Sequence, residues 1–199
     1  MRFITDRTIG EDARPDAAWY ALCTRHQHEK NVAGSLSSRG FEVFLPLHEE
    51  IRSWSDRRKR LHLPLFSCYV FVRSSLDRKM DILVTSGVHA FVSFDGNPAP
   101  IPHSEIEDLR RVIQAARIEP HPFLRYGDWV RVKSGPFEGI EGFLVRRKRQ
   151  ARLVLSVEML EKSVAMEIDA VLTERIWRSN FARKTGSMAC SAGEFGTAG

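Results

Sequence analysis

The sequence has few of the features that mark secreted, membrane or disulfide-bonded proteins. Its three cysteines, Cys23, Cys68 and Cys190, are far apart and odd in number, so they provide neither a disulfide framework nor a CxxC zinc pattern. This pattern is typical of a reducing compartment, and we expect the protein to be cytoplasmic. The first residues lack the apolar core of a signal peptide. The longest apolar run, Leu65 to Val72, is far too short to cross a bilayer, so we expect no membrane association.

The motifs of common enzyme classes are also missing. The chain has no P-loop, GxGxxG, HExxH or GxSxG sequence. His26 and His28 are two positions apart, so on the helix expected there they do not share a face as metal ligands would. Cys23 and Cys68 fall in predicted buried strands, where a thiol acts as a small apolar filler. We therefore expect no enzymatic activity, no cofactor and no metal site.

The composition indicates a folded protein with a mild basic excess. A chain of 199 residues suits one or two small domains, and a hydrophobic content of 43% can build a core. The formal net charge of +5 favours polyanionic partners such as nucleic acid. We expect a monomer.

The most informative stretch is Tyr126 to Val145. Val130 and Val132 alternate with polar neighbours, which is the period of a strand with one buried face. Gly135 and Pro136 end that strand, and Gly142 precedes a second apolar run, where a glycine fits a sharp bend or a close backbone approach. The pattern is that of a small, curved barrel, or of any antiparallel hairpin.

The N-terminal half begins with a strand, a helix and a second strand. Trp19–Cys23 is a buried strand by its aromatic and apolar content. Thr24 and Gln27 have the spacing of a capping box, which predicts a helix starting at Thr24. Gly40 is placed to end this helix, and Phe41–Leu45 follows as a strand.

A hairpin with a basic tip comes next. The arms are Ile51–Trp54 and Leu61–Leu65, and residues 55–60 between them include four consecutive cations. Four adjacent cations cannot be buried, so the tip is exposed. This tip either projects toward nucleic-acid phosphates or is a solvated turn.

The remaining elements complete an α+β sandwich. Leu65–Val72 reads as a central strand covered on both faces. Asp77–Thr85 looks helical, with Met80, Leu83 and Val84 inward, and Val88–Phe94 is a strand. Apolar residues at helical spacing predict a helix over 104–118. We assign this domain to residues 18–118, after a flexible arm at 1–17.

The C-terminal part reads as a linker, a barrel and a tail. Two prolines within 119–124 predict a short, stiff linker. Alternating apolar residues over 125–177 predict a five-stranded, SH3-like barrel with a turn at 159–162. The residues 178–199 lack apolar periodicity, and we expect them to be disordered.

Both halves resemble the NusG family of transcription factors. The stretch from Tyr126 to Val145 resembles the KOW motif of the family's C-terminal domain. The N-terminal half resembles the family's NGN domain. The matching residues are Trp19-Tyr20, His28-Glu29-Lys30, Phe44-Leu45-Pro46, the basic Arg57–Arg60, Tyr69-Val70-Phe71-Val72, Gly87-Val88 and Phe91-Val92. The resemblance covers roughly Ala18 to Trp177, with two domains in the family's order.

The resemblance implies an RNA polymerase-binding protein that reduces pausing and termination. Its N-terminal domain would dock on the polymerase clamp helices through an apolar depression, and its KOW domain would bind termination factor Rho or a ribosomal small-subunit protein. The implied docking residues are Cys23, Phe66, Ser67, Tyr69, Phe71, Arg78 and Lys79. The residues implied to lie near nucleic acid are Arg25, Arg57, Arg58, Lys59 and Arg60. The implied partner-binding residues of the KOW domain are Ile140, Met159, Leu160 and Lys162.

The sequence departs from the housekeeping pattern at two places. The family usually has Phe-Pro-Gly-Tyr where this chain has Phe66-Ser67-Cys68-Tyr69, and the aromatic residue of the KOW turn is missing from 159–162. These departures, with the extra arm and tail, favour a specialised paralogue resembling the RfaH-like and UpxY-like antiterminators. The alternative is a KOW-containing RNA-binding or ribosome-associated protein that does not bind polymerase.

Overall fold

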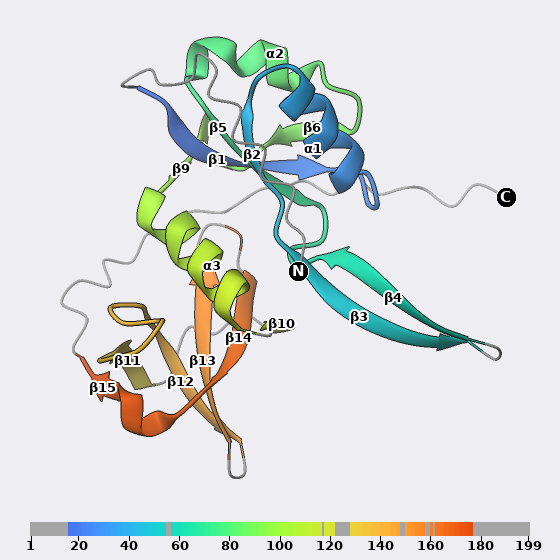
Figure 1. Cartoon of the computed structure of the whole chain (residues 1–199). Coiled ribbons are helices and arrows are strands. Elements are labelled where there is room, and N and C mark those ends of the chain that lie inside the picture. The colour runs from blue at the N-terminus through green and yellow to red at the C-terminus, as the bar shows by residue number, and fades with distance from the viewer. Residues whose placement is uncertain are drawn as a thin grey trace, which may run out of the picture.

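The computed structural model of the chain describes residues 16–54, 57–116, 118–121, 128–147, 150–157, 160 and 162–176. These residues form an N-terminal α+β domain followed by a β-rich C-terminal domain, as the sequence predicts (Figure 1). The arm predicted at 1–17 falls outside the described residues except for Asp16 and Ala17, and the tail predicted at 178–199 falls wholly outside them.

The N-terminal domain is organised around an antiparallel sheet with the strand order β2-β5-β1-β6, and β9 also pairs with β1. The strands are β1 (Ala18–Thr24), β2 (Glu42–Phe44), β5 (Tyr69–Ser74), β6 (Val88–Phe91) and β9 (Pro100–Ile101). β5 lies inside the sheet, which confirms the predicted central strand, although Leu65–Cys68 forms a turn before it. The predicted strand Val88–Phe94 ends as β6 at Phe91, and Ser93 and Phe94 belong to a separate small hairpin.

Alternating side chains give this sheet two apolar faces. On one face, Tyr20, Leu22 and Val70 pack with the inner residues of α1 (Glu29–Ser38). On the other face, Trp19 and Ala21 point toward the apolar side of α3 (His103–Ala115). The sheet is therefore sandwiched between layers, because residues of odd and even number in each strand face opposite ways.

The start of α1 differs from the sequence prediction. Thr24 is the last residue of β1 and its N–H donates to the Cys68 carbonyl (2.9 Å), so it does not cap a helix. Gln27 has a φ of +63°, which is left-handed and interrupts a helix. A tertiary backbone bond thus overrides the capping-box pattern, and α1 begins at Glu29.

The end of α1 agrees with the prediction. Gly40 has a φ of +81°. Its N–H donates to the Ser37 carbonyl (3.0 Å), and the Phe41 N–H donates to the Leu36 carbonyl (3.1 Å). These two bonds form a Schellman motif, in which glycine takes the left-handed position at no steric cost.

The second helical segment is shorter than predicted. The 3-10 turn η1 (Leu76–Arg78) leads into α2 (Lys79–Leu83). The prediction that Met80 and Val84 point inward is wrong, because they are 66% and 69% exposed while Ile82 is fully buried. One helical turn buries a single position, and the longer apolar stripe predicted here does not form.

Two hairpins extend the N-terminal domain. β3 (Leu47–Trp54) pairs with β4 (Arg57–Pro64), and β7 (Ser93–Phe94) pairs with β8 (Asn97–Pro98). Figure 1 shows the β3–β4 hairpin projecting away from the sheet. The cations Arg57–Arg60, predicted at the tip, belong to β4 itself, because Trp54 already pairs with Arg57.

The C-terminal domain is one antiparallel sheet with the order β10-β14-β13-β12-β11-β15. The strands are β10 (Ile118–His121), β11 (Asp128–Val132), β12 (Glu141–Arg147), β13 (Gln150–Val157), β14 (Lys162–Ile168) and β15 (Thr173–Arg175), with the 3-10 turn η3 (Ala170–Leu172) before β15. Five of these strands fall in the predicted barrel. β10 is additional and occupies the start of the predicted linker, since residues 118–121 pair with β14.

Gly142 is required by close packing of two strands. A β-carbon at this position would lie 2.6 Å from the Val154 carbonyl oxygen on β13. Real β-carbons do not approach backbone oxygen this closely, so only glycine lets β12 and β13 meet here. The close approach predicted from the sequence is confirmed.

Candidate functional site

Several of the predicted docking residues lie together on the α3 side of the N-terminal sheet. Cys23 pairs with Tyr69 across β1 and β5, and Phe71 lies two residues further along β5. The Phe66 ring, in the turn before β5, packs edge-on against Phe71 with ring centroids 5.6 Å apart. Phe44 extends this group, 5.9 Å from Phe71. We call this group of rings the aromatic face.

The aromatic face is covered in this conformation. Phe66 is 2% exposed and Phe71 is fully buried. Both belong to one apolar cluster that runs through α3 into the C-terminal domain. The cluster includes Ile106, Leu109, Val112 and Ile113 of α3, and Val130, Leu155, Val164 and Met166 of the C-terminal sheet. Tyr69 is half-buried against the cluster and Ser67 is exposed, so these two residues mark its accessible edge.

Arg110 is a component of this face that the sequence did not reveal. Its guanidinium lies 5.0 Å from the Trp19 ring centroid and 5.2 Å from that of Phe44. It also pairs with Glu42 at 3.1 Å and with Glu107 at 2.7 Å. A cation held between rings and two carboxylates orients α3 against the sheet, because both contacts are directional.

Polar contacts join α3 to the C-terminal domain. Arg111 Nη2 donates to the backbone carbonyl of Pro136 (3.3 Å) and Arg111 also pairs with Asp108 (3.6 Å). Burial raises the pKa of the Asp108 carboxyl, the Arg111 guanidinium opposes this rise, and nearby Glu141 and Glu107 add to it. Glu141, on β12, accepts from Trp129 Nε1 at 3.1 Å. The two domains therefore meet through charged groups around an apolar centre.

Two predicted docking residues lie on the opposite side of the sheet. The Arg78 guanidinium stacks over the Phe41 ring at 3.9 Å and pairs with Asp81 at 3.5 Å. Lys79 follows at the start of α2 and is partly exposed. Phe41 packs with the α1 side of the sheet, so Arg78 and Lys79 are separated from Phe66 by the sheet itself.

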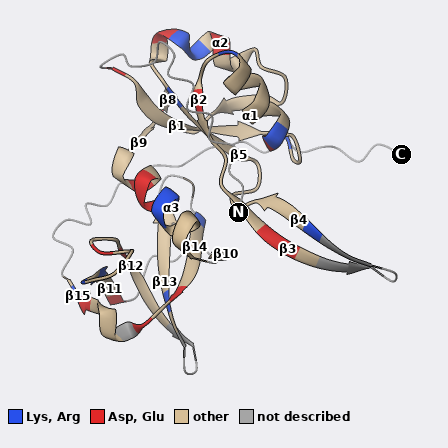
Figure 2. Cartoon of the chain, viewed as in Figure 1, with Lys and Arg blue, Asp and Glu red and all other residues tan. Residues whose placement is uncertain are grey.

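The predicted nucleic-acid residues are spread over two elements. Arg25 is exposed just after β1. Arg60, on β4, pairs with Glu49 of β3 at 3.4 Å, and its side chain is 76% exposed. The side chains of Arg57, Arg58 and Lys59 lie outside the described part. Figure 2 shows the acidic stretch of β3 and, on β4, the basic stretch that contains Arg60.

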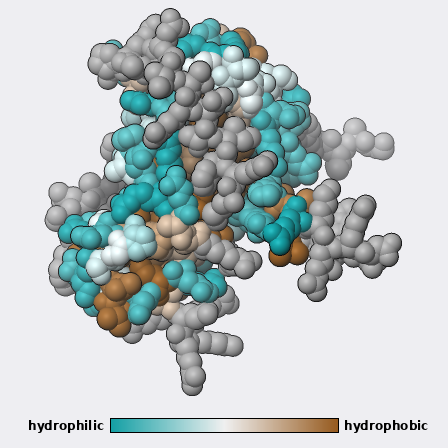
Figure 3. Space-filling model, viewed as in Figure 1, coloured by the Kyte–Doolittle hydropathy of each residue, from teal (hydrophilic) through white to brown (hydrophobic). Residues whose placement is uncertain are grey.

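The predicted partner-binding residues of the C-terminal domain are mostly interior. Ile140 is fully buried and Leu160 is 4% exposed, while Lys162 is exposed at the start of β14. Met159 lies outside the described residues. Exposed apolar side chains occur instead at η3, where Val171 is 76% exposed and Leu172 is 37% exposed. Figure 3 also shows a hydrophobic patch at its lower left, on the side of the molecule where Figure 1 draws the C-terminal domain.

One cluster of metal-ligand side chains occurs within the described residues. His26, Glu29 and Cys68 bring their ligand atoms within 4.8 Å of one another. The sequence predicts no metal site because His26 and His28 do not share a helix face, no CxxC pattern occurs, and Cys68 is expected inside a buried strand. Cys68 lies instead in the turn before β5 and is only partly buried. In the structure His26 lies in the loop before α1, and Cys68 comes from 42 positions away. This juxtaposition depends on tertiary folding and has no signal in local spacing.

Within the described residues, no helix has the length and apolar content needed to span a bilayer. A family profile described as "Transcription termination factor nusG" matches residues 17–110. The transcription termination/antitermination protein NusG of Escherichia coli strain K12 is 26% identical over 177 residues, which cover 81% of this chain and 97% of that protein. The same protein of Vibrio parahaemolyticus is 26% identical over 178 residues, with the same coverage.

A solved structure shares the fold of both domains. It is described as "Domain interaction in Thermotoga maritima NusG" and has a TM-score of 0.50 at 21% identity. The match covers 81% of this chain and 98% of that one. Because it covers 81% of this chain, more than either domain makes up alone, it includes residues of both the N-terminal sandwich and the β-rich C-terminal domain.

Proposed function

We propose that the chain is a non-enzymatic transcription factor of the NusG family, which binds RNA polymerase through the aromatic face and reduces pausing and termination. The match to this family supports a general role as a transcription elongation or termination factor. The observation that carries the docking proposal is the packing of Phe66 against Phe71, with half-buried Tyr69 beside them.

Aromatic rings suit this role because they bury a large apolar area with few rotatable bonds. Binding energy at protein interfaces concentrates in a few such residues. A helical tip, such as the polymerase clamp helices, fits an apolar face of this kind as an amphipathic helix fits a groove. Tyr69 and Ser67 lie at the accessible edge, so we propose that the partner first engages there.

Docking over the whole face requires that the C-terminal domain move away from it. Phe66 and Phe71 share one apolar cluster with residues of that domain. The contact also includes the exposed hydrogen bonds of Arg111, which are individually weak in water. We propose that polymerase binding displaces the C-terminal domain, which then recruits a partner through exposed Lys162 and through Ile140 and Leu160, two members of the shared cluster that are buried in the present conformation. A ribosomal small-subunit protein or Rho would fill that role.

The test is in vitro transcription with purified polymerase, with and without Rho, measuring pausing and read-through. Ser67→Arg places a large cation at the exposed edge of the aromatic face, and we expect it to abolish the effect of the protein. Ser86→Arg adds the same charge at an exposed position after α2 and serves as the matched control. An equal effect of both variants would contradict the proposal.

The alternative is an RNA-binding protein that does not touch polymerase. It is favoured by one observation, the strongly exposed Arg60 on the projecting basic strand β4. Binding through phosphates weakens steeply with salt, whereas apolar docking does not. Binding of the chain to RNA that falls with salt and is untouched by Ser67→Arg, together with no retention on polymerase, would favour this alternative.

A further inference from the structure

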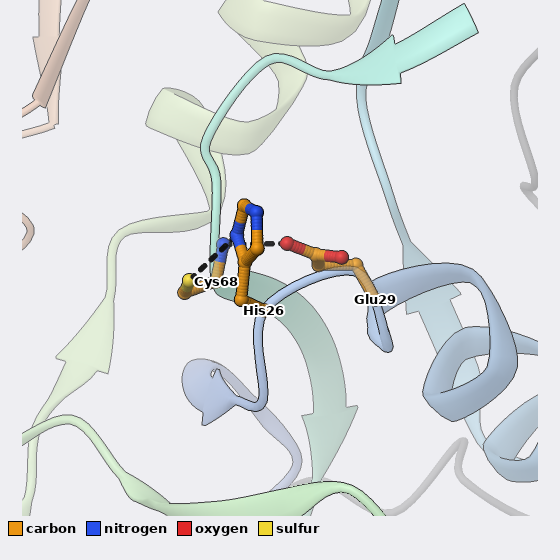
Figure 4. Close-up of side chains that lie close together, drawn as sticks. All are labelled: His26, Glu29 and Cys68. Atoms are coloured by element: carbon orange, nitrogen blue, oxygen red, sulfur yellow. Dashed lines mark hydrogen bonds between the residues drawn. The ribbon is translucent and has the colours of Figure 1, made fainter. Parts of the chain in front are cut away.

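We propose that His26, Glu29 and Cys68 form a Zn²⁺ site that joins the loop before α1 to the turn before β5. The Cys68 Sγ lies 3.8 Å from His26 Nδ1 (Figure 4). In a tetrahedral zinc site, bonds of about 2.3 Å to sulfur and about 2.0 Å to nitrogen place these two atoms roughly 3.5 Å apart. The two ligand atoms are thus already near the separation that a shared zinc ion imposes.

The ligands are held in place by backbone contacts. The Cys68 N–H donates to Glu29 Oε1 at 2.7 Å, and the Cys68 carbonyl accepts from the Thr24 N–H at 2.9 Å. On the other side, the Arg25 N–H donates to the Gly87 carbonyl at 2.9 Å. The turn that carries Cys68 is therefore fixed to β1, and the loop that carries His26 is fixed to the turn before β6, so the site is largely formed before a metal arrives.

The burial of Glu29 is the second observation that favours a cation. Glu29 is 3% exposed, and within the described residues no lysine or arginine forms an ion pair with it. A buried carboxylate without a cation is unfavourable unless it is neutralised or strongly hydrogen-bonded. Its Oε1, the carboxylate oxygen nearer to His26 in Figure 4, accepts one bond from the Cys68 N–H and keeps a second lone pair for a metal ion.

The ligand atoms of His26, Glu29 and Cys68 favour zinc over other divalent cations. A thiolate with an imidazole and one carboxylate suits Zn²⁺, whereas Mg²⁺ and Ca²⁺ prefer oxygen ligands alone. His26 is exposed, so water can complete the fourth position. On binding, the Cys68 thiol loses its proton to the solvent and a sulfur–zinc bond forms, with no change in oxidation state.

The backbone at Cys68 gives a way to test the site without unfolding the protein. Cys68 has a φ of +67°, a conformation that glycine adopts more readily than cysteine. Cys68→Gly therefore removes the thiol while relieving the backbone. A loss of metal binding in this variant cannot be attributed to failure to fold, provided that its thermal midpoint without metal equals or exceeds that of the wild type.

The experiment uses the full chain, stripped with a chelator and titrated with Zn²⁺ and with Co²⁺ as a spectroscopic probe. We expect one Zn²⁺ per chain, a raised thermal midpoint with Zn²⁺, and a sulfur-to-cobalt charge-transfer band. Cys68→Gly should abolish the band, and His26→Ala should weaken Zn²⁺ binding at least about 100-fold, since even groups that only support ligands contribute roughly 10–100-fold. Cys23→Ser and Cys190→Ala should leave the band in place.

Three results would overturn the proposal. One is the absence of a thiolate–cobalt band in the wild type. A second is a band that survives Cys68→Gly, which would assign binding to another cysteine. The third is Zn²⁺ affinity in His26→Ala within about threefold of the wild type, well short of the loss expected for a ligand. None of these measurements involves polymerase, so they test the metal site independently of the proposed function.

Discussion

The guanidinium of Arg111, on α3, donates a hydrogen bond of 2.9 Å to the backbone carbonyl of Glu138, between β11 and β12. This bond connects the helix that covers the aromatic face to the C-terminal domain. Because it is exposed, its net contribution is modest, about 1 kcal/mol. Removing this exposed bond is a direct way to weaken the contact between the two domains.

We predict that Arg111→Ala increases the affinity for RNA polymerase. If the two domains must separate before docking, removing about 1 kcal/mol from the contact between them makes docking roughly fivefold tighter. Equilibrium binding to purified polymerase measures the change. Arg39→Ala is the control, because among the described residues Arg39 donates to Asp81 and Thr85, both in the N-terminal domain. Weaker polymerase binding by Arg111→Ala would show that the closed contact does not compete with docking.

A second prediction concerns the closely packed strands of the C-terminal domain. Gly142→Ala places a β-carbon 2.6 Å from the Val154 carbonyl oxygen, which forces β12 and β13 apart. We expect a destabilisation of about 1–3 kcal/mol, the usual cost of overpacking. Gly34→Ala on α1, where nothing lies within 4 Å of the new carbon, should instead stabilise by about 0.5–1 kcal/mol. Urea unfolding distinguishes the two; equal effects would rule out a steric cause.

A third prediction follows from Asp108, at the contact between the domains. Burial raises the pKa of this carboxyl above its usual value of 3.8. Its contribution to stability is therefore fully present below pH 3.8 and is lost as the pH rises through the raised pKa. Asp108→Asn cannot ionise, so its unfolding free energy relative to the wild type should increase from acid to neutral pH. A difference that is constant or falls with pH would contradict this.

The fourth prediction tests the projecting hairpin. Replacing Arg57, Arg58, Lys59 and Arg60 by glutamine should reduce the salt dependence of binding to a polymerase–nucleic acid complex. Each lost phosphate contact lowers the slope of log affinity against log salt by roughly 0.9. Lys30→Gln removes one exposed cation from α1 and should leave the slope unchanged. An unaltered slope in the hairpin variant means that β4 does not approach phosphate.

Local patterns predicted much of the fold because their causes are local. Val130 and Val132 alternate in the sequence and are 2% and 1% exposed in the structure. The apolar spacing over 104–118 becomes α3, ending at Ala115. Gly40 adopts a left-handed backbone conformation, and Gly142 lies where two strands approach closely. Both positions favour glycine because it has no β-carbon.

The features that the sequence did not reveal depend on distant partners. Thr24 has the spacing of a helix cap, but its backbone bonds to Cys68 and continues β1. Ile118–His121 contains a proline and looks like a linker, yet it pairs with β14. The sequence gives no sign that Arg110 is more than a surface cation, but in the structure α3 places its guanidinium over the Trp19 ring. The cover over the aromatic face is likewise a contact between domains, which periodicity within either domain cannot show.

The central claim is that the aromatic face is where this chain holds RNA polymerase. The test is direct equilibrium binding of the purified full chain to polymerase at low and high salt. The test variant is Tyr69→Ala, and the control is Phe94→Ala, which removes a partly exposed ring on β7. The account predicts salt-tolerant binding that Tyr69→Ala weakens at least tenfold, about 1.4 kcal/mol, and that Phe94→Ala leaves intact. Binding that is absent, or that both variants retain at wild-type strength, would contradict it.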